Sequence, residues 1–157
     1  MKNLIKLLFP LKTAYAHCDI PCGVYDPNPA QIAAHTVIRM TKLITELEGD
    51  TRETEHKLVR YTNVKEENAE IVKHEVVVLW GDYFKEEHLK EYPQLTEAVF
   101  HTLKLASKTK QEISMDAAKD LLDHVHEIAE IFYKTKGVET KKIKAYYPTE
   151  GDLVVPK

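Results

Sequence analysis

The sequence is poor in cysteine, in tryptophan and in long apolar runs, and it has no excess of basic residues. Two cysteines are too few for a disulfide-rich scaffold. No apolar run approaches the roughly 20 residues that cross a bilayer, so we expect no membrane segment. The formal net charge is −3, whereas nucleic-acid binding needs a basic footprint, so we expect no nucleic-acid partner.

The composition that remains is that of an ordinary globular protein. The chain has 157 residues, 43% of them hydrophobic and 30% charged, which suits one domain with a proper core. From residue 17 onward there are 19 basic and 25 acidic residues, a net charge of −6. An anionic substrate would therefore need local positive potential near its site.

Both cysteines lie in one short segment, residues 17–27, which reads HCDIPCGVYDP. Two thiols, an imidazole and the backbone nitrogens between them fall within six residues. Nickel and copper favour such sulfur and nitrogen donors in tetragonal geometry. The segment therefore indicates a metal site with His17, Cys18 and Cys22 as ligands. A Cys18–Cys22 disulfide in an exported protein stays open as the alternative.

The residues before this segment resemble a leader. Residues 1–16 carry three lysines and no acid, and they end in Ala14-Tyr15-Ala16, small residues that peptidases accept. A cut after Ala16 would give His17 a free α-amine, which is a further nitrogen donor. Lys6, Pro10 and Lys12 limit the apolar run to five residues, short for a secretory signal. We therefore expect a cytoplasmic protein, with export as the alternative.

The segment 17–27 resembles the N-terminal hook of the nickel-containing superoxide dismutases, which reads His-Cys-Asp-x-Pro-Cys-Gly-x-Tyr after a short leader. Two further blocks resemble the family, LWGDYFK at residues 79–85 and IFYKTK at residues 131–136. The likeness runs from His17 to about Lys136. It leaves the leader and the residues after 137 outside.

The resemblance implies a nickel-dependent enzyme that disproportionates superoxide to oxygen and hydrogen peroxide by Ni(II)/Ni(III) cycling. One nickel ion per subunit would be held by His17, Cys18 and Cys22, with nitrogen donors from the His17 amine and the Cys18 backbone. A maturation peptidase would remove residues 1–16, and the subunits would form a homohexamer. A metal-binding helical bundle without turnover remains an alternative, as does the exported, disulfide-bonded bundle.

The resemblance also implies roles around the metal. Tyr25 and Tyr83 match two tyrosines that screen the open axial face and organise water and protons; for Tyr25 the alternative is plain packing. Asp19 would bond within the hook loop, and a cis peptide before Pro21 would fold that loop back. Lys85 would draw in the anion, although a solvated surface lysine is the competing interpretation.

One departure from the family concerns a glutamate–arginine pair that holds the axial imidazole in some members. An ungapped comparison around each block places Ala33 and Asn68 at those positions. The pair is therefore expected to be absent here, which leaves the redox tuning unexplained.

Apolar residues at spacings of three and four predict an all-α fold, an antiparallel four-helix bundle with the N-terminal metal-binding hook. The boundaries are 1–16 for the leader, 17–27 for the hook, 28–137 for the bundle and 138–157 for a C-terminal extension. Helices are expected to start near Asn28, at Thr51 or Thr54, at Pro93 and after Ser114. The apolar positions are Ala33, Val37, Met40, Ile44 and Leu47; Leu58, Tyr61, Val64, Val72, Val76 and Leu79; Leu95, Val99, Thr102 and Ala106; Ala118, Leu121, Val125, Ile128 and Phe132.

Three regions carry less pattern. Residues 76–80 could alone form a buried strand, but the helical phase before them favours helix. Residues 81–93 are expected to be a connection. Residues 138–157 look like an extended arm. We expect a loose tail, with packing on a neighbouring subunit as the alternative. The seven histidines after residue 17 are expected on the surface.

Overall fold

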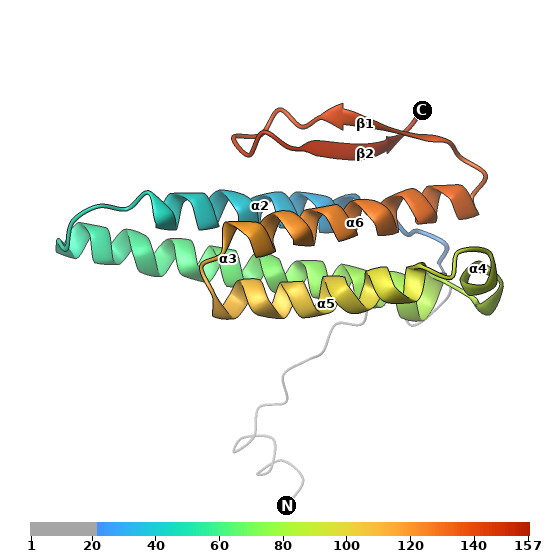
Figure 1. The fold of residues 1–157 in the computed structure, drawn as a ribbon, viewed down its shortest axis with the longest axis horizontal. Coiled ribbons are helices and arrows are strands. Elements are labelled where there is room, and N and C mark those ends of the chain that lie inside the picture. The colour runs from blue at the N-terminus through green and yellow to red at the C-terminus, as the bar shows by residue number, and fades with distance from the viewer. Residues whose placement is uncertain (1–21) are drawn as a thin grey trace, which may run out of the picture.

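The computed structural model describes residues 22–157 and is mostly helical, which confirms the coarse prediction (Figure 1). The leader and hook residues 17–21 lie outside the described residues. The elements in chain order are α2 (Asn28–Thr45), α3 (Arg52–Val78), the π-helical turn η1 (Leu79–Tyr83), α4 (Glu86–Glu91), α5 (Leu95–Gln111), α6 (Met115–Thr135), β1 (Thr140–Lys144) and β2 (Asp152–Pro156).

Two of the predicted helix starts are made by the residues expected to make them. The Thr51 hydroxyl accepts the Thr54 backbone N–H at 3.2 Å and begins α3. The Ser114 hydroxyl accepts the Ala117 N–H at 3.2 Å and begins α6. Each bond satisfies an N–H that has no partner inside the helix.

The start of α2 differs by one residue from the prediction. Asn28 lies inside the helix rather than capping it, and Pro27 occupies the N-cap position without a side-chain bond. The Asp26 carboxylate accepts the Asn28 N–H at 2.7 Å instead. The first turn of α2 is therefore held by a residue of the segment 17–27, which ties that segment to the helix.

The four long helices pack side by side around one core, with α2 against α3 and α6, and α5 against α3 and α6. All the inward positions predicted for α5 and α6 are buried. Leu58 of α3 is an exception, since it is 40% exposed. The reason is length: α3 has 27 residues and α5 only 17, so α2 and α3 extend beyond the other two helices (Figure 1).

The connection at residues 81–93 contains helical structure that the sequence did not suggest. Helix α3 runs through Val78, which confirms helix over strand, and continues as η1. The Phe84 N–H bonds Leu79 O at 2.9 Å, five residues back. Such π turns inside helices are frequent at functional sites.

The prediction of a loose tail was wrong, because residues 140–156 form an antiparallel hairpin that lies over α2 and α6 (Figure 1). The pairing runs from Thr140 opposite Pro156 to Lys144 opposite Asp152. Val154 of β2 is buried. An isolated two-stranded hairpin is marginal in water, so this one depends on packing against the helices.

The hairpin is fastened by buried polar side chains of α2 and α6. The Gln31 amide donates to Val154 O at 3.0 Å and accepts the Val154 N–H at 2.8 Å. The Nε2 atoms of His35 and His126 both contact Asp152 O, at 2.9 and 3.0 Å. The surface prediction was therefore wrong for these two histidines, which are buried because the hairpin covers them.

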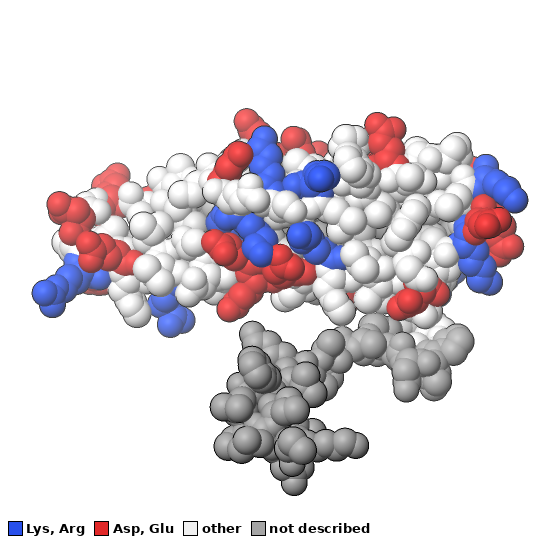
Figure 2. All heavy atoms as spheres, turned by 90° about the horizontal axis from the view of Figure 1, so that it is seen from below, with Lys and Arg blue, Asp and Glu red and all other residues white. Residues whose placement is uncertain are grey.

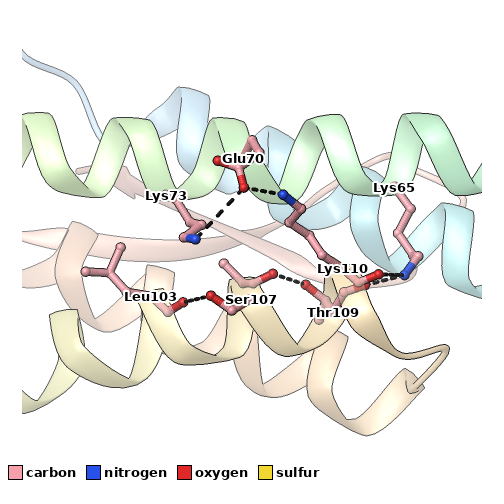
Figure 3. Close-up of polar contacts among 8 residues, drawn as sticks. Lys65, Glu70, Lys73, Leu103, Ser107, Thr109 and Lys110 are labelled. Carbon is pink, nitrogen blue, oxygen red and sulfur yellow. Dashed lines mark hydrogen bonds and ion pairs between the residues drawn. The ribbon is translucent and has the colours of Figure 1, made fainter.

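A buried lysine joins α3 to the end of α5. Lys65 is only 2% exposed, and its ammonium donates to the backbone carbonyls of Thr109 and Glu112. These carbonyls have no helical N–H partner, and they carry the negative end of the α5 dipole. Figure 3 shows this contact beside the exposed ion pairs between Glu70 of α3 and the lysines Lys73 and Lys110.

The face of the molecule shown in Figure 2 carries charges of both signs. Lysines and carboxylates lie mixed on the face seen in Figure 2, as expected from the exposed ion pairs. Among residues 22–157, no helix combines the length and the apolar character needed to cross a membrane.

Candidate metal site

The end of the segment 17–27 is described from Cys22 onward. The Cys22 side chain is exposed, and its sulfur accepts the Val24 N–H at 3.4 Å across a turn made by Gly23, whose φ is +74°. A donated N–H stabilises a thiolate over a thiol, which suits a metal ligand. The other predicted site residues of this segment, His17, Cys18, Asp19 and Pro21, lie outside the described residues.

The structure brings the two predicted tyrosines together. The ring centroids of Tyr25 and Tyr83 are 5.5 Å apart, with 52° between their planes. Tyr25 ends the hook motif, and Tyr83 ends η1. The end of the hook thus packs on the second block of the sequence, 58 positions along the chain. Their roles toward a metal stay a prediction.

Tyr83 lies in a cluster of aromatic side chains at this end of the helices. Its ring contacts those of Phe84 at 5.2 Å, His88 at 5.7 Å and Phe132 at 4.6 Å. Its hydroxyl is 2.7 Å from the hydroxyl of Thr135, at the end of α6. The phenol at the end of the π turn is therefore held by side chains of the short helix α4 and of the end of α6.

Two lysines lie near this cluster in different ways. The Lys136 ammonium is 5.4 Å from the ring centroid of Tyr83 and 4.7 Å from that of Phe132. The side chain of Lys85 is 71% exposed, and its ammonium is 3.9 Å from a Glu87 carboxylate oxygen. The positive charge held on the cluster is thus that of Lys136. The anion-drawing role of Lys85 stays a prediction.

Sequence reasoning missed Thr135 and Lys136 as site residues. Both belong to the block 131–136 that carried part of the family resemblance, so the signal was present without a role. Their neighbour Tyr133 is also affected by the hook. Burial raises its phenol pKa, and the negative charge of Asp26 raises it further.

The described residues contribute one of the three predicted ligands. Residues 22–157 hold no cluster of three or more His, Cys, Asp or Glu side chains that could bind a metal ion. The other two predicted ligands precede Cys22 and lie outside the described residues, so the ligand set stays a prediction. A solvent-accessible sulfur that follows a second thiol and an imidazole by four and five residues is a donor set that suits nickel.

The positions of the missing glutamate–arginine pair are filled by other chemistry. Ala33 packs in the helical core. The Asn68 amide donates to Val64 O of its own helix at 2.8 Å. Neither position supplies a carboxylate or a guanidinium, so these two side chains cannot form the glutamate–arginine pair of the family.

Comparison with known proteins agrees with the geometry. The family model for nickel-containing superoxide dismutase matches residues 12–136. The chain is similar to superoxide dismutase [Ni] of Streptomyces coelicolor, with 41% identity over 133 residues, covering 85% of this chain and 98% of that protein. The corresponding protein of Streptomyces seoulensis is 39% identical, with the same coverage.

Solved structures agree as well. The native structure of nickel superoxide dismutase matches at 40% identity with a TM-score of 0.69, covering 77% of this chain and 99% of that one. A structure whose nickel ligation corresponds to the oxidised state matches at 38% identity and a TM-score of 0.70, with the same coverage. The hairpin of β1 and β2 lies beyond the residues that the family model matches.

Proposed function

This chain belongs to the nickel-containing superoxide dismutase family, and on that premise we propose that it disproportionates superoxide at a nickel ion held by His17, Cys18 and Cys22. The observation that carries the proposal is the contact between Tyr25 and Tyr83. It packs the end of the hook onto a cluster that supplies phenol hydroxyls and a nearby ammonium. The ammonium attracts the superoxide anion, and the phenols order the water from which the reduced anion takes its protons.

The ligands explain why nickel suits this chain. When bound, nickel supplies the one-electron couple that alternately oxidises and reduces superoxide. Anionic donors stabilise the higher metal charge, so the thiolates of Cys18 and Cys22 bring the potential into a usable range. The amine of His17 becomes a donor only when residues 1–16 have been removed. Cleavage is therefore the step that completes the site.

The residues beside the site handle the anion and its protons. Tyr25 and Tyr83 screen the open face and order water there. Lys136 places a positive charge beside the site in a chain of net negative charge, since its ammonium is held against the ring of Tyr83. We propose that Lys85 adds attraction from the solvent side, where its side chain is exposed.

We also propose an antiparallel four-helix bundle with an N-terminal hook, associated as a homohexamer in the cytoplasm. Short connections between α2 and α3 and between α5 and α6 support the antiparallel arrangement. Several large apolar side chains are exposed, namely Val59, Phe100 and Ile113. Only a contiguous apolar patch would indicate an association surface, so the proposal of a homohexamer rests on the family resemblance. Native mass spectrometry of the cleaved protein tests the assembly.

The test of the activity compares two chains that differ by one residue. One chain begins at His17 and the other at Ala16; both are loaded with nickel and assayed for superoxide disproportionation. We expect the second chain to lose more than about 100-fold in turnover, because its His17 nitrogen is an amide rather than an amine. The nickel content of each chain is measured alongside.

The outcomes separate the alternatives. Equal turnover by the two chains would show that the amine is not a ligand. A chain that begins at His17, binds nickel and does not turn over superoxide would refute the proposed activity. Loss of two hydrogens from the intact mass, without nickel, would indicate the Cys18–Cys22 disulfide instead.

A further inference from the structure

We propose that Thr135 is a positioning residue for Tyr83, fixing the direction in which the phenol hydrogen points. The proposal rests on the function proposed above, in which Tyr83 faces the metal site. It starts from the contact between the two hydroxyls, 2.7 Å apart. Thr135 is the last residue of α6, more than fifty positions beyond Tyr83.

The hydrogen bonds at the end of α6 set the direction. The Thr135 hydroxyl donates to Phe132 O at 2.7 Å. In a regular α-helix that carbonyl would accept the Lys136 N–H, but this N–H bonds Tyr133 O at 3.0 Å. Because the helix tightens at its end, the Phe132 carbonyl is open to a side-chain donor.

A threonine hydroxyl carries one hydrogen, and here the Phe132 carbonyl receives it. The Tyr83 phenol must therefore be the donor in its contact with Thr135. The chain of bonds runs in one direction, from the Tyr83 O–H to the Thr135 oxygen and from the Thr135 O–H to the Phe132 carbonyl. It ends on the backbone of a long helix.

Among the described residues, the bond to Thr135 fixes the direction of the Tyr83 O–H bond. The ring is held in place by the rings of Phe84, His88 and Phe132. Ring packing does not choose between the two in-plane directions of an O–H bond. Thr135 selects one of them, because that direction brings the hydrogen to the Thr135 oxygen.

The consequence is a phenol oxygen that accepts on its remaining side. With its hydrogen committed to Thr135, Tyr83 presents lone pairs to water or to a protonated oxygen species arriving at the site. A freely rotating phenol would donate to such a species part of the time. Thr135 thus keeps the water molecules that bond Tyr83 in one orientation. Holding groups in the productive orientation contributes to the reaction rate.

Two substitutions separate the hydroxyl from the shape of the side chain. Thr135→Val keeps the branched shape and removes the hydroxyl, whereas Thr135→Ser keeps a hydroxyl that can bond Phe132 O. Tyr83→Phe and the double variant Tyr83→Phe with Thr135→Val complete a cycle. All are prepared as full-length mature protein beginning at His17 and loaded with nickel.

The readout that does not depend on activity is the ring-carbon NMR shift of tyrosine labelled beside the hydroxyl. Tyr83→Phe identifies the Tyr83 resonance by removing it. We expect Thr135→Val to move this resonance and Thr135→Ser to leave it near the wild-type position. The same measurement on the nickel-free protein tests the contact independently of the metal.

The kinetic readout is kcat/KM for superoxide across pH. We expect Thr135→Val to lose about three- to tenfold, the effect of one neutral hydrogen bond, and Thr135→Ser to stay within about twofold. The double variant should be no slower than Tyr83→Phe alone. An unmoved Tyr83 resonance in Thr135→Val, or additive losses in the double variant, would overturn the positioning role. A wild-type protein that binds nickel but does not turn over superoxide would instead refute the proposed function.

Discussion

The two segments that flank the long helices, the end of the hook and the C-terminal hairpin, attach to the helices through different kinds of contact. At the hook end, Tyr25 packs on Tyr83 within a cluster of aromatic rings, and the sulfur of Cys22 stays exposed. At the C-terminal end, the hairpin is fastened by the buried amide of Gln31 and the imidazoles of His35 and His126. The first attachment leaves the Cys22 sulfur accessible, whereas the second pairs the buried amide of Gln31 and the buried imidazoles with backbone groups of the hairpin.

The hook therefore serves the chemistry of the protein, whereas the hairpin serves its stability. A metal site needs ligands that can reach an ion, so its sulfur cannot be fully enclosed before the ion arrives. The hairpin has no such need, and its buried hydrogen bonds make one docking position strongly preferred, because any other would leave polar groups unpaired. Substitutions at the two ends should therefore change different measurements.

The largest effect is expected from Cys22→Ser. Removing a thiolate ligand should lower superoxide turnover by more than about 100-fold, which already exceeds the usual effect of losing an outer-sphere partner. The melting temperature of the nickel-free protein should stay close to wild type, since Cys22 is exposed. Activity, nickel content and thermal unfolding are measured on the same sample. Full turnover by Cys22→Ser would show that the Cys22 thiolate is not needed for catalysis.

Gln31→Leu tests the other end. It leaves the Val154 N–H and carbonyl unpaired in a buried place, and we expect a loss of about 1–3 kcal/mol in the free energy of unfolding. Turnover per nickel at 25 °C should not change. Thr36→Val is the matched control on α2, because that hydroxyl bonds Ile32 O of its own helix. Equal unfolding midpoints for Gln31→Leu and wild type would show that the hairpin does not contribute through this contact.

A smaller effect distinguishes the two lysines near Tyr83. We expect Lys136→Gln to lower kcat/KM about two- to fivefold at low ionic strength, because its charge is held on the ring cluster. Lys85→Gln should have less effect, since Lys85 is exposed and lies near Glu87. Added salt should reduce both differences. The reverse order would place the useful charge on Lys85.

The smallest expected effect is a pH dependence of the hairpin end alone. Burial holds the pKa of His35 and His126 below 6.5, and Lys142 lowers that of His126 further, against the opposing effect of Asp152. Below about pH 6.5 the unfolded chain therefore binds protons that the folded chain does not. Stability is present above that pH and falls as the pH decreases. Chemical unfolding measured from pH 8 to pH 5 should show this slope.

His35→Gln is the control for the pH dependence. It removes one of the two titrating groups, so the slope between pH 7 and pH 5 should become shallower. A slope that matches wild type would mean that other groups control the acid sensitivity. Between pH 7 and pH 8, nickel-loaded His35→Gln should turn over superoxide at the same rate as the wild-type protein.

The same contrast explains what the sequence predicted. The long helices carry local signals, namely apolar spacing and the caps Thr51 and Ser114, and these were confirmed. The hook is a run of consecutive residues and needed no tertiary information. The hairpin was missed because the contacts that hold it join residues 114 to 123 positions apart for α2, which no local pattern encodes.

Within the site, the limit was also distance along the chain. Tyr25 and Tyr83 were found through the resemblance rather than from periodicity. Thr135 lies in a block that resembles the family. Its role depends on the end of α6, where the Thr135 hydroxyl donates to Phe132 O and accepts from the Tyr83 hydroxyl. The hidden histidines were missed for the same reason, since their burial is made by the hairpin.

The central claim is that cutting before His17 creates the enzyme. It is tested most directly by N-terminal sequencing, nickel analysis and superoxide turnover of the protein purified from the cells that make it. The account predicts a chain beginning at His17, one nickel per chain and full turnover. A fully active protein that still begins at Met1 would contradict it.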